Sequence, residues 1–151
     1  MKYLKKAMAL WAVAAVLAPT VVTAETRIQS DISYRRELMA AMDWNLVRIA
    51  QTLRHERPYD PSRIAGEGRA LAMLATLPWV AFVPGSDRGA TKAAARIWQQ
   101  PQAFEAAVTH FEAVTRELAQ ATARAPLAAA AHPLEQVADA CRSCHHPKNG
   151  S

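Results

Sequence analysis

Residues 101–122 read PQAFEAAVTHFEAVTRELAQAT and predict one amphipathic helix. Pro101 suits the first turn, because its fixed φ is already helical and its missing N–H would have no partner there. The side chains expected on the buried stripe recur at intervals of three and four residues: Phe104, Val108, Phe111, Thr115, Leu118 and Thr122. A helix with one apolar face must bury it against another element, so the fold class depends on what the rest of the chain offers.

Three further segments carry the same helical periodicity. The first runs from about residue 30 to Leu53, the second begins near Ser62 as a candidate N-cap, and the last begins near Pro133. Their expected inward positions are Ile32, Met39, Met42, Leu46, Ile49 and Leu53, then Ile64, Leu71, Leu74 and Leu77, and finally Leu134, Val137, Cys141 and Cys144. No segment alternates with a period of two for long enough to predict a sheet. We therefore predict an all-α fold, an antiparallel up-down four-helix bundle.

The connection between the second and third helices, residues 77–91, is unusually apolar for a loop. Its sequence, LPWVAFVPGSDRGAT, contains two prolines and two glycines but also Trp79 and Phe82. Large aromatic side chains are out of place in a free linker, so we expect this loop to pack over the core or over a ligand.

The N-terminus has the features of a secretory signal peptide. Three lysines within residues 1–6 precede the apolar run of residues 7–18, and Val22 and Ala24 occupy the positions that a signal peptidase reads. The apolar run is too short to span a bilayer comfortably and no stop-transfer segment follows, so we expect no stable membrane insertion. We predict a cleaved signal peptide at 1–24, rather than a buried helix, and a periplasmic domain at 25–151.

Loss of the predicted signal peptide changes the charge balance. The formal net charge of the whole chain is +5, and removing three lysines leaves +2. A charge this small does not indicate binding to nucleic acid or to a membrane surface.

Both cysteines of the chain lie in Cys141-Arg-Ser-Cys-His-His146, near the end of the last predicted helix. At about 100° per residue, Cys144 lies at about −60° and His145 at about +40° from Cys141, whereas His146 lies at about +140°. Both sulfurs and His145 therefore share one face. This arrangement predicts one covalent haem c, with thioether bonds from both cysteines and His145 as the proximal iron ligand.

Three other uses of the cysteine pair have less support. A disulfide between Cys141 and Cys144 would close so short a loop that it would constrain the unfolded chain little. Zinc would need two further ligands, normally a second paired cluster, and the chain has no third cysteine. A redox dithiol belongs at a helix N-terminus, where the helix dipole lowers the thiol pKa, whereas this pair is at a C-terminus.

Arg35 falls on the predicted inward face of the first helix, between Ile32 and Met39, where a charge is costly unless it is paired. It could extend from the bundle end into solvent, or it could bind a haem propionate, since a guanidinium matches a carboxylate well. Arg36 could do likewise or face water. Met39 lies one helical turn beyond Arg35, and its thioether could be the sixth iron ligand or an ordinary core filler. Met42 could play either part.

Five short motifs are spread over nearly all of the chain after the signal peptide. They are Ile32-Ser-Tyr-Arg-Arg36, Pro58-Tyr-Asp60, Leu77-Pro-Trp-Val-Ala-Phe-Val-Pro-Gly85, Ile97-Trp98 and Cys141-Arg-Ser-Cys-His145. Together they resemble the cytochrome c′ family, exported bacterial four-helix bundles with one haem near the C-terminus. The resemblance implies that Cys141 and Cys144 hold the haem and that His145 binds the iron. It also implies that Arg35 and Arg36 fall where the family contacts the haem.

By the same resemblance, Met39 falls at the distal position, which has two forms in the family. In the high-spin branch an apolar side chain crowds an empty sixth site, which small gases such as nitric oxide can still enter. In the low-spin branch a methionine binds the iron, and the protein looks like an electron carrier.

The C-terminal residues depart from the family pattern. Family members usually continue the last helix past the histidine with an aromatic and then a basic residue. Here Pro147 disfavours helix at His146 and should end the helix there. Asn149 stands where the basic residue is expected, with Lys148 the nearest cation.

We therefore expect a monohaem c-type cytochrome, a homodimer by resemblance, that exchanges single electrons with redox partner proteins. The alternative is a high-spin protein that binds or sequesters nitric oxide or another small gas beside Met39. A third hypothesis is a haem-free helical protein with a terminal disulfide or metal pair, which a haem stain after denaturing electrophoresis would establish or eliminate. No arrangement of nucleophile, base and oxyanion hole is visible, so we do not expect an enzyme.

Overall fold

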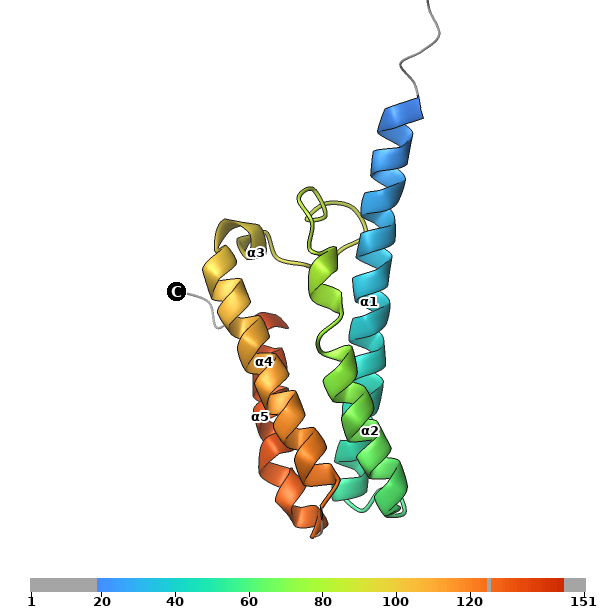
Figure 1. Cartoon of the computed structure of the whole chain (residues 1–151), viewed down its shortest axis with the longest axis vertical. Helices are drawn as coiled ribbons and strands as arrows, with labels where there is room; N and C mark the ends of the chain where they lie inside the picture. Colours follow the sequence, from blue (N-terminus) through green and yellow to red (C-terminus); the bar gives the residue numbers. More distant parts are fainter. Residues whose placement is uncertain (1–18, 125, 146–151) are drawn as a thin grey trace, which may run out of the picture.

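Four long helices form an antiparallel bundle in the computed structural model, which describes residues 19–124 and 126–145 and the side chains of residues 25–124 and 126–145 (Figure 1). They are α1 (Pro19–Leu53), α2 (Pro61–Leu74), α4 (Pro101–Thr122) and α5 (Ala131–His145). Along the chain they run alternately down and up, with α2 packed against α1 and α4, and α5 packed against α4 and α1. The predicted all-α, up-down four-helix bundle is confirmed.

Helix α1 begins earlier than its sequence pattern predicts. It starts at Pro19 instead of near residue 30. Residues 19–29 contain no glycine, and their one proline is at the first helical position, where proline is tolerated, so nothing in this segment stops the helix. Residues 1–18 of the predicted signal peptide lie outside the described residues, and residues 19–24 form the first turns of α1. Within 19–124 and 126–145, no helix is both long and apolar enough to cross a membrane.

Helix α1 ends at Leu53, as predicted, in a turn that closes on His55. His55 has a φ of 61°, in the left-handed region. Its N–H donates to the carbonyl of Thr52 at 3.1 Å, and the N–H of Glu56 donates to the carbonyl of Gln51 at 2.9 Å. These two bonds form a Schellman motif, which satisfies carbonyls that a helix end leaves without partners.

Helix α2 is capped by Asp60, so the prediction of Ser62 as its N-cap was wrong. The Oδ1 atom of Asp60 accepts hydrogen bonds from the backbone N–H groups of Ser62 at 3.0 Å and Arg63 at 3.1 Å. Pro61 occupies the first helical position, so the capping residue is the one before it.

Three short helical turns fill the connections. They are the 3₁₀ turns η1 (Pro78–Ala81) and η2 (Leu127–Ala130), and the single α-helical turn α3 (Arg96–Gln99). Helix α4 begins at Pro101, as predicted, whereas α5 begins at Ala131, two residues before the predicted Pro133. The main core is formed mostly by side chains of the four long helices, and its fully buried members include Ile49, Ile64, Leu71, Leu118 and Val137.

Gly68 allows α2 to approach α4 closely. A Cβ at this position would lie 2.1 Å from Oγ1 and 3.2 Å from Cβ of Thr122. Thr122 is buried, and its Oγ1 donates to the carbonyl of Ala119 at 3.0 Å, so it cannot move aside without losing a hydrogen bond. We expect Gly68→Ala to lower the free energy of unfolding by about 1–3 kcal/mol, because overpacking outweighs the gain in helix propensity.

Gly66 provides the matched control for this prediction, since it lies in the same helix. A Cβ at Gly66 would meet no atom of another described element within 4 Å. Gly66→Ala should therefore raise the free energy of unfolding by up to about 1 kcal/mol, through helix propensity alone. Denaturant unfolding of the two variants measures the difference, and equal stability would show that α2 and α4 are not in tight contact at Gly68.

Candidate functional site

A cavity of about 430 Å³ lies in the bundle end that contains η1 and α3. Side chains from α1, α3, α4, α5 and the connection between α2 and α3 line it. The lining includes six predicted site residues: Arg35, Arg36, Met39, Cys141, Cys144 and His145. The fold therefore brings together three residues from α1 and three from the last turns of α5.

Aromatic rings form much of the cavity wall. Trp79 lies 6.0 Å from Phe82, 5.9 Å from Phe104 and 6.1 Å from Phe111, measured between ring centroids. The indole N–H of Trp79 donates to the carbonyl of Ala75 at 2.6 Å, which leaves its ring as an apolar surface. The prediction that the loop over residues 77–91 packs over the core or a ligand is confirmed, since Trp79 and Phe82 both line the cavity.

Arg35 is buried, with 3% of its surface exposed, and binds the loop after η1. Its Nη1 donates to the carbonyl of Ala81 at 3.1 Å and to Oγ of Ser86 at 2.8 Å. Its Nη2 donates to the carbonyl of Ser86 and, at 2.7 Å, to Oγ1 of Thr91. The guanidinium carbon also lies 4.6 Å from the centre of the Phe82 ring. All four N–H groups of the two terminal nitrogens thus have acceptors.

The acceptors around Arg35 are neutral, although its charge is buried. Burial lowers the pKa of Arg35, and the negative charge of Asp31 acts in the opposite direction. Arg35 does not extend into solvent, which was one of the two hypotheses from sequence. Contact between Arg35 and a haem propionate stays a prediction. In the structure the guanidinium of Arg35 anchors the loop after η1.

Positive charge gathers at the cavity. Arg36 is exposed, and its Nη1 donates to the carbonyl of Ala90 at 3.3 Å. Lys92 and Arg96 also line the cavity, and neither Asp nor Glu is among the lining side chains of the described residues. Sequence reasoning missed Lys92 and Arg96, although Arg96 immediately precedes the Ile97-Trp98 motif. Four cations and no anion suit a ligand that carries carboxylates.

The two cysteines lie on one side of the cavity and are not joined in a disulfide. Cys141 is half-buried and Cys144 is exposed. Burial, followed by the neighbouring Cys144 and Asp43, raises the pKa of the Cys141 thiol to about 11. This thiol is therefore protonated at neutral pH, unlike the attacking thiol of a redox dithiol, which needs thiolate character.

Met39 and Met42 lie in different environments in the structure. Met39 is half-buried and lines the cavity, whereas Met42 is buried in the main core and is not among the lining residues. His145 lines the cavity at the end of α5. The predictions that concern His146, Pro147, Lys148 and Asn149 lie outside the described residues.

Comparison with known proteins decides the family. Residues 30–147 match the family model for cytochrome c′. The chain belongs to the cytochrome c′ family. It is 30% identical over 116 residues to cytochrome c′ of Rubrivivax gelatinosus, an alignment that covers 76% of this chain and 89% of that protein. It is also similar to the solved structure of cytochrome c prime from Shewanella frigidimarina, with a TM-score of 0.75, 25% identity, and coverage of 78% of this chain and 92% of that one.

Members of this family carry a covalent haem c, and the site in this member fits that group. The chain has two cysteines, enough for one haem with two thioether bonds, so it carries one haem c through Cys141 and Cys144. The aromatic wall around Trp79 offers the apolar surface that a flat macrocycle needs. The four cations at the cavity are opposite in sign to the two propionates of a haem and can pair with them.

Proposed function

We propose that this cytochrome c′ family member transfers single electrons through a haem whose iron is bound by His145 and Met39. The observation that carries the proposal is the position of Met39. The described side chains of α1 that line the cavity are Arg35, Arg36 and Met39, and of these only Met39 can bind iron at neutral pH. A haem closed by two protein ligands can change its oxidation state without exchanging ligands.

The surrounding side chains suit this role. The rings of Phe82, Phe104 and Phe111 each contact the ring of Trp79, and the four rings give the cavity an apolar wall. Arg35 fixes the loop that carries Phe82, so this wall is rigid before any partner binds. A methionine ligand and nearby cations both favour the reduced state, so we expect a higher reduction potential than a bis-histidine site would have.

Met39→Leu tests the ligand assignment directly. Leucine has about the volume of methionine but no sulfur, so the fold should persist while the sixth ligand is lost. We expect the optical spectrum of the ferric holoprotein to change from low-spin to high-spin, and the ferrous form to gain carbon monoxide binding.

Met42→Leu is the matched control, because Met42 lies on the same helix but in the core. Its spectrum should remain that of the unsubstituted protein. If Met39→Leu and Met42→Leu give the same spectrum, Met39 does not bind the iron.

Binding of a small gas is the second candidate function. It is supported by similarity to a solved structure, the nitric oxide complex of a variant of cytochrome c prime from Alcaligenes xylosoxidans. That structure has a TM-score of 0.74 and 25% identity to this chain, over 80% of this chain and 93% of that one. In this alternative the Met39 side chain packs over an open iron site and limits which ligands enter.

Location and partners belong to the same proposal. The signal-peptide pattern of residues 1–24 supports export to the periplasm, where the partners would be other redox proteins. Exposed apolar side chains on α1, on α2 and in or just before η1 support a homodimer: Tyr34, Trp44, Val47, Met73, Leu77 and Val80. Sedimentation of the holoprotein would show a single-chain mass if the homodimer is wrong. We propose no bond-making or bond-breaking reaction beyond electron exchange.

A further inference from the structure

The last turn of α5 is held from outside the helix by Arg96. The Nη2 atom of Arg96 donates to the backbone carbonyl of Cys144 at 3.1 Å. Arg96 is half-buried and lines the cavity together with Cys144 and His145. Figure 1 shows α3, which carries Arg96, at the end of the bundle toward which α5 runs.

The backbone that carries Arg96 is itself fixed. The indole N–H of Trp98 donates to the carbonyl of Val83 at 3.2 Å, and the Trp98 ring lies 6.1 Å from that of Phe82. Phe82 in turn lies beneath the guanidinium of Arg35. Arg96 therefore reaches α5 from a segment that is tied to the loop and to α1, and not from a free surface chain.

A cation at this position acts on α5 in two ways. The last carbonyl groups of an α-helix have no partner within the helix, and a hydrogen bond from outside satisfies one of them. The same end of the helix carries partial negative charge, which a cation within the last turn offsets. The turn that Arg96 binds contains Cys144 and His145, so whatever fixes this turn also fixes the side chain of His145.

We propose that Arg96 is a positioning residue for His145. It holds the last turn of α5 through the Cys144 carbonyl and keeps a positive charge beside the proximal side of the site. The inference rests on the proposed role of His145 as an iron ligand, but it does not depend on whether Met39 is the second ligand.

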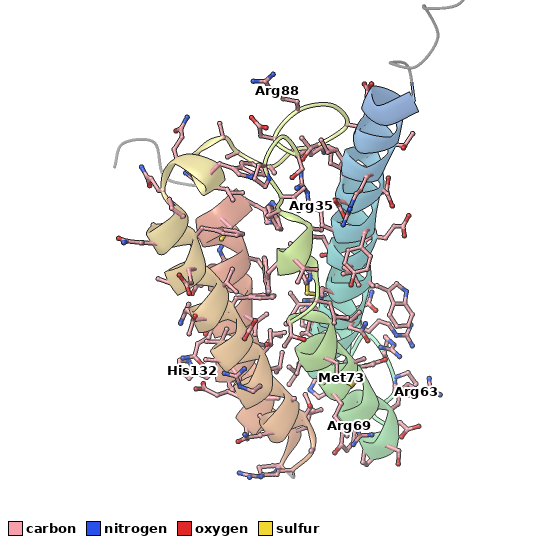
Figure 2. All side chains as sticks on the ribbon, turned by 45° about the horizontal axis from the view of Figure 1, so that its top comes forward. Arg35, Arg63, Arg69, Met73, Arg88 and His132 are labelled. Carbon is pink, nitrogen blue, oxygen red and sulfur yellow. The ribbon has the colours of Figure 1, made fainter. Side chains whose placement is uncertain are left out.

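Arg96→Gln, Arg96→Lys and Arg88→Gln in the holoprotein test this inference. Arg88 is the matched control, because it is exposed at the outer edge of the same connection and removing it makes the same charge change (Figure 2). The readouts are the reduction potential and the hydrogen exchange of the backbone amides of residues 142–145.

Arg96→Gln should lower the equilibrium constant for reduction of the haem by about fivefold, because a nearby cation disfavours the oxidised haem, which carries one more positive charge than the reduced haem. A tenfold change would correspond to about 59 mV for a one-electron couple. Exchange at residues 142–145 should become at least about fivefold faster. In Arg96→Lys the equilibrium constant for reduction should stay within about twofold of the parent value. Arg88→Gln should change neither the potential nor the exchange rates.

Three results would overturn the inference. One is an equal shift of the reduction potential in Arg96→Gln and Arg88→Gln, which would indicate only a general effect of the lost charge. Another is faster exchange with an unchanged potential, which would make Arg96 an ordinary helix cap. The third is a change of more than about threefold in the equilibrium constant for reduction in Arg96→Lys, a result that decides the question if Arg96→Gln does not acquire haem. A high-spin spectrum of the unsubstituted protein would refute ligation by Met39. The comparison of the Arg96 variants with Arg88→Gln would still test the role of Arg96, because it depends on His145 and not on Met39.

Discussion

Arg35→Gln should lower the free energy of unfolding of the holoprotein by about 3–5 kcal/mol, because several buried hydrogen-bond acceptors lose their donors at once. The guanidinium of Arg35 makes four hydrogen bonds to Ala81, Ser86 and Thr91. A glutamine is too short to replace them, and buried acceptors left without donors cost about 1–3 kcal/mol each, not additively. Ser86 is fully buried, so water cannot easily take the place of the lost donors.

Arg36→Gln is the control for this prediction, since it makes the same substitution at the next residue. Arg36 is exposed and makes one long hydrogen bond, to Ala90 at 3.3 Å. We expect its free energy of unfolding to stay within about 0.5 kcal/mol of the parent. Denaturant unfolding measures both values, and amide exchange over residues 81–91 should accelerate in Arg35→Gln alone. Equal effects at Arg35 and Arg36 would contradict the role of Arg35 as the loop anchor.

The haem-free chain should lack a fixed tertiary structure. In Cys141→Ala/Cys144→Ala no thioether can form, and the cavity of about 430 Å³ is left without its covalent occupant. Without the haem, the apolar side chains that line this cavity face water, so their burial against the macrocycle no longer stabilises the fold. The total stability of a domain is only about 5–15 kcal/mol, so we expect this loss to remove a large part of it.

Circular dichroism and dye binding separate the possible outcomes for the double variant. We expect far-ultraviolet ellipticity to persist, because the helices have their own periodicity, and the near-ultraviolet signal of Trp79 and Trp98 to disappear. Exposed apolar surface should then bind a hydrophobic dye. A cooperative unfolding transition at the temperature of the holoprotein would show instead that the bundle is complete without haem.

The helices were predictable because their signals are local. The stripe from Phe104 to Thr122, the proline at residue 101 and the end of α1 at Leu53 each depend on neighbouring residues, and each was found where the sequence placed it. The start of α1 was not, because residues 19–29 carry no stop signal and no clear stripe. The N-cap of α2 was missed because Asp60 and Ser62 are both good capping residues and Pro61 decides between them.

The sequence predicted which residues form the site, but not which residues they contact. Helical spacing from Cys141 placed Cys144 and His145 on one face, and the structure puts all three at the cavity. Periodicity also drew attention to Arg35 as a charge in a core position. Its partners could not be read from sequence, since Ser86 and Thr91 are 51 and 56 residues away. Arg96 was missed for the same reason, because its contact with Cys144 joins residues 48 positions apart.

Met39 shows how the structure narrows a hypothesis. From sequence, Met39 and Met42 were both on the inward face of one helix and either could have been a ligand. The structure assigns Met42 to the core and Met39 to the cavity wall. Spacing alone could not separate them, because the boundary between core and cavity depends on where the loop after η1 packs.

The optical spectrum of the unsubstituted ferrous holoprotein, recorded with and without carbon monoxide, tests the central claim most directly. Ligation by both His145 and Met39 predicts a low-spin spectrum that carbon monoxide does not change. A high-spin spectrum that shifts on addition of carbon monoxide would contradict ligation by Met39 and would favour the gas-binding function.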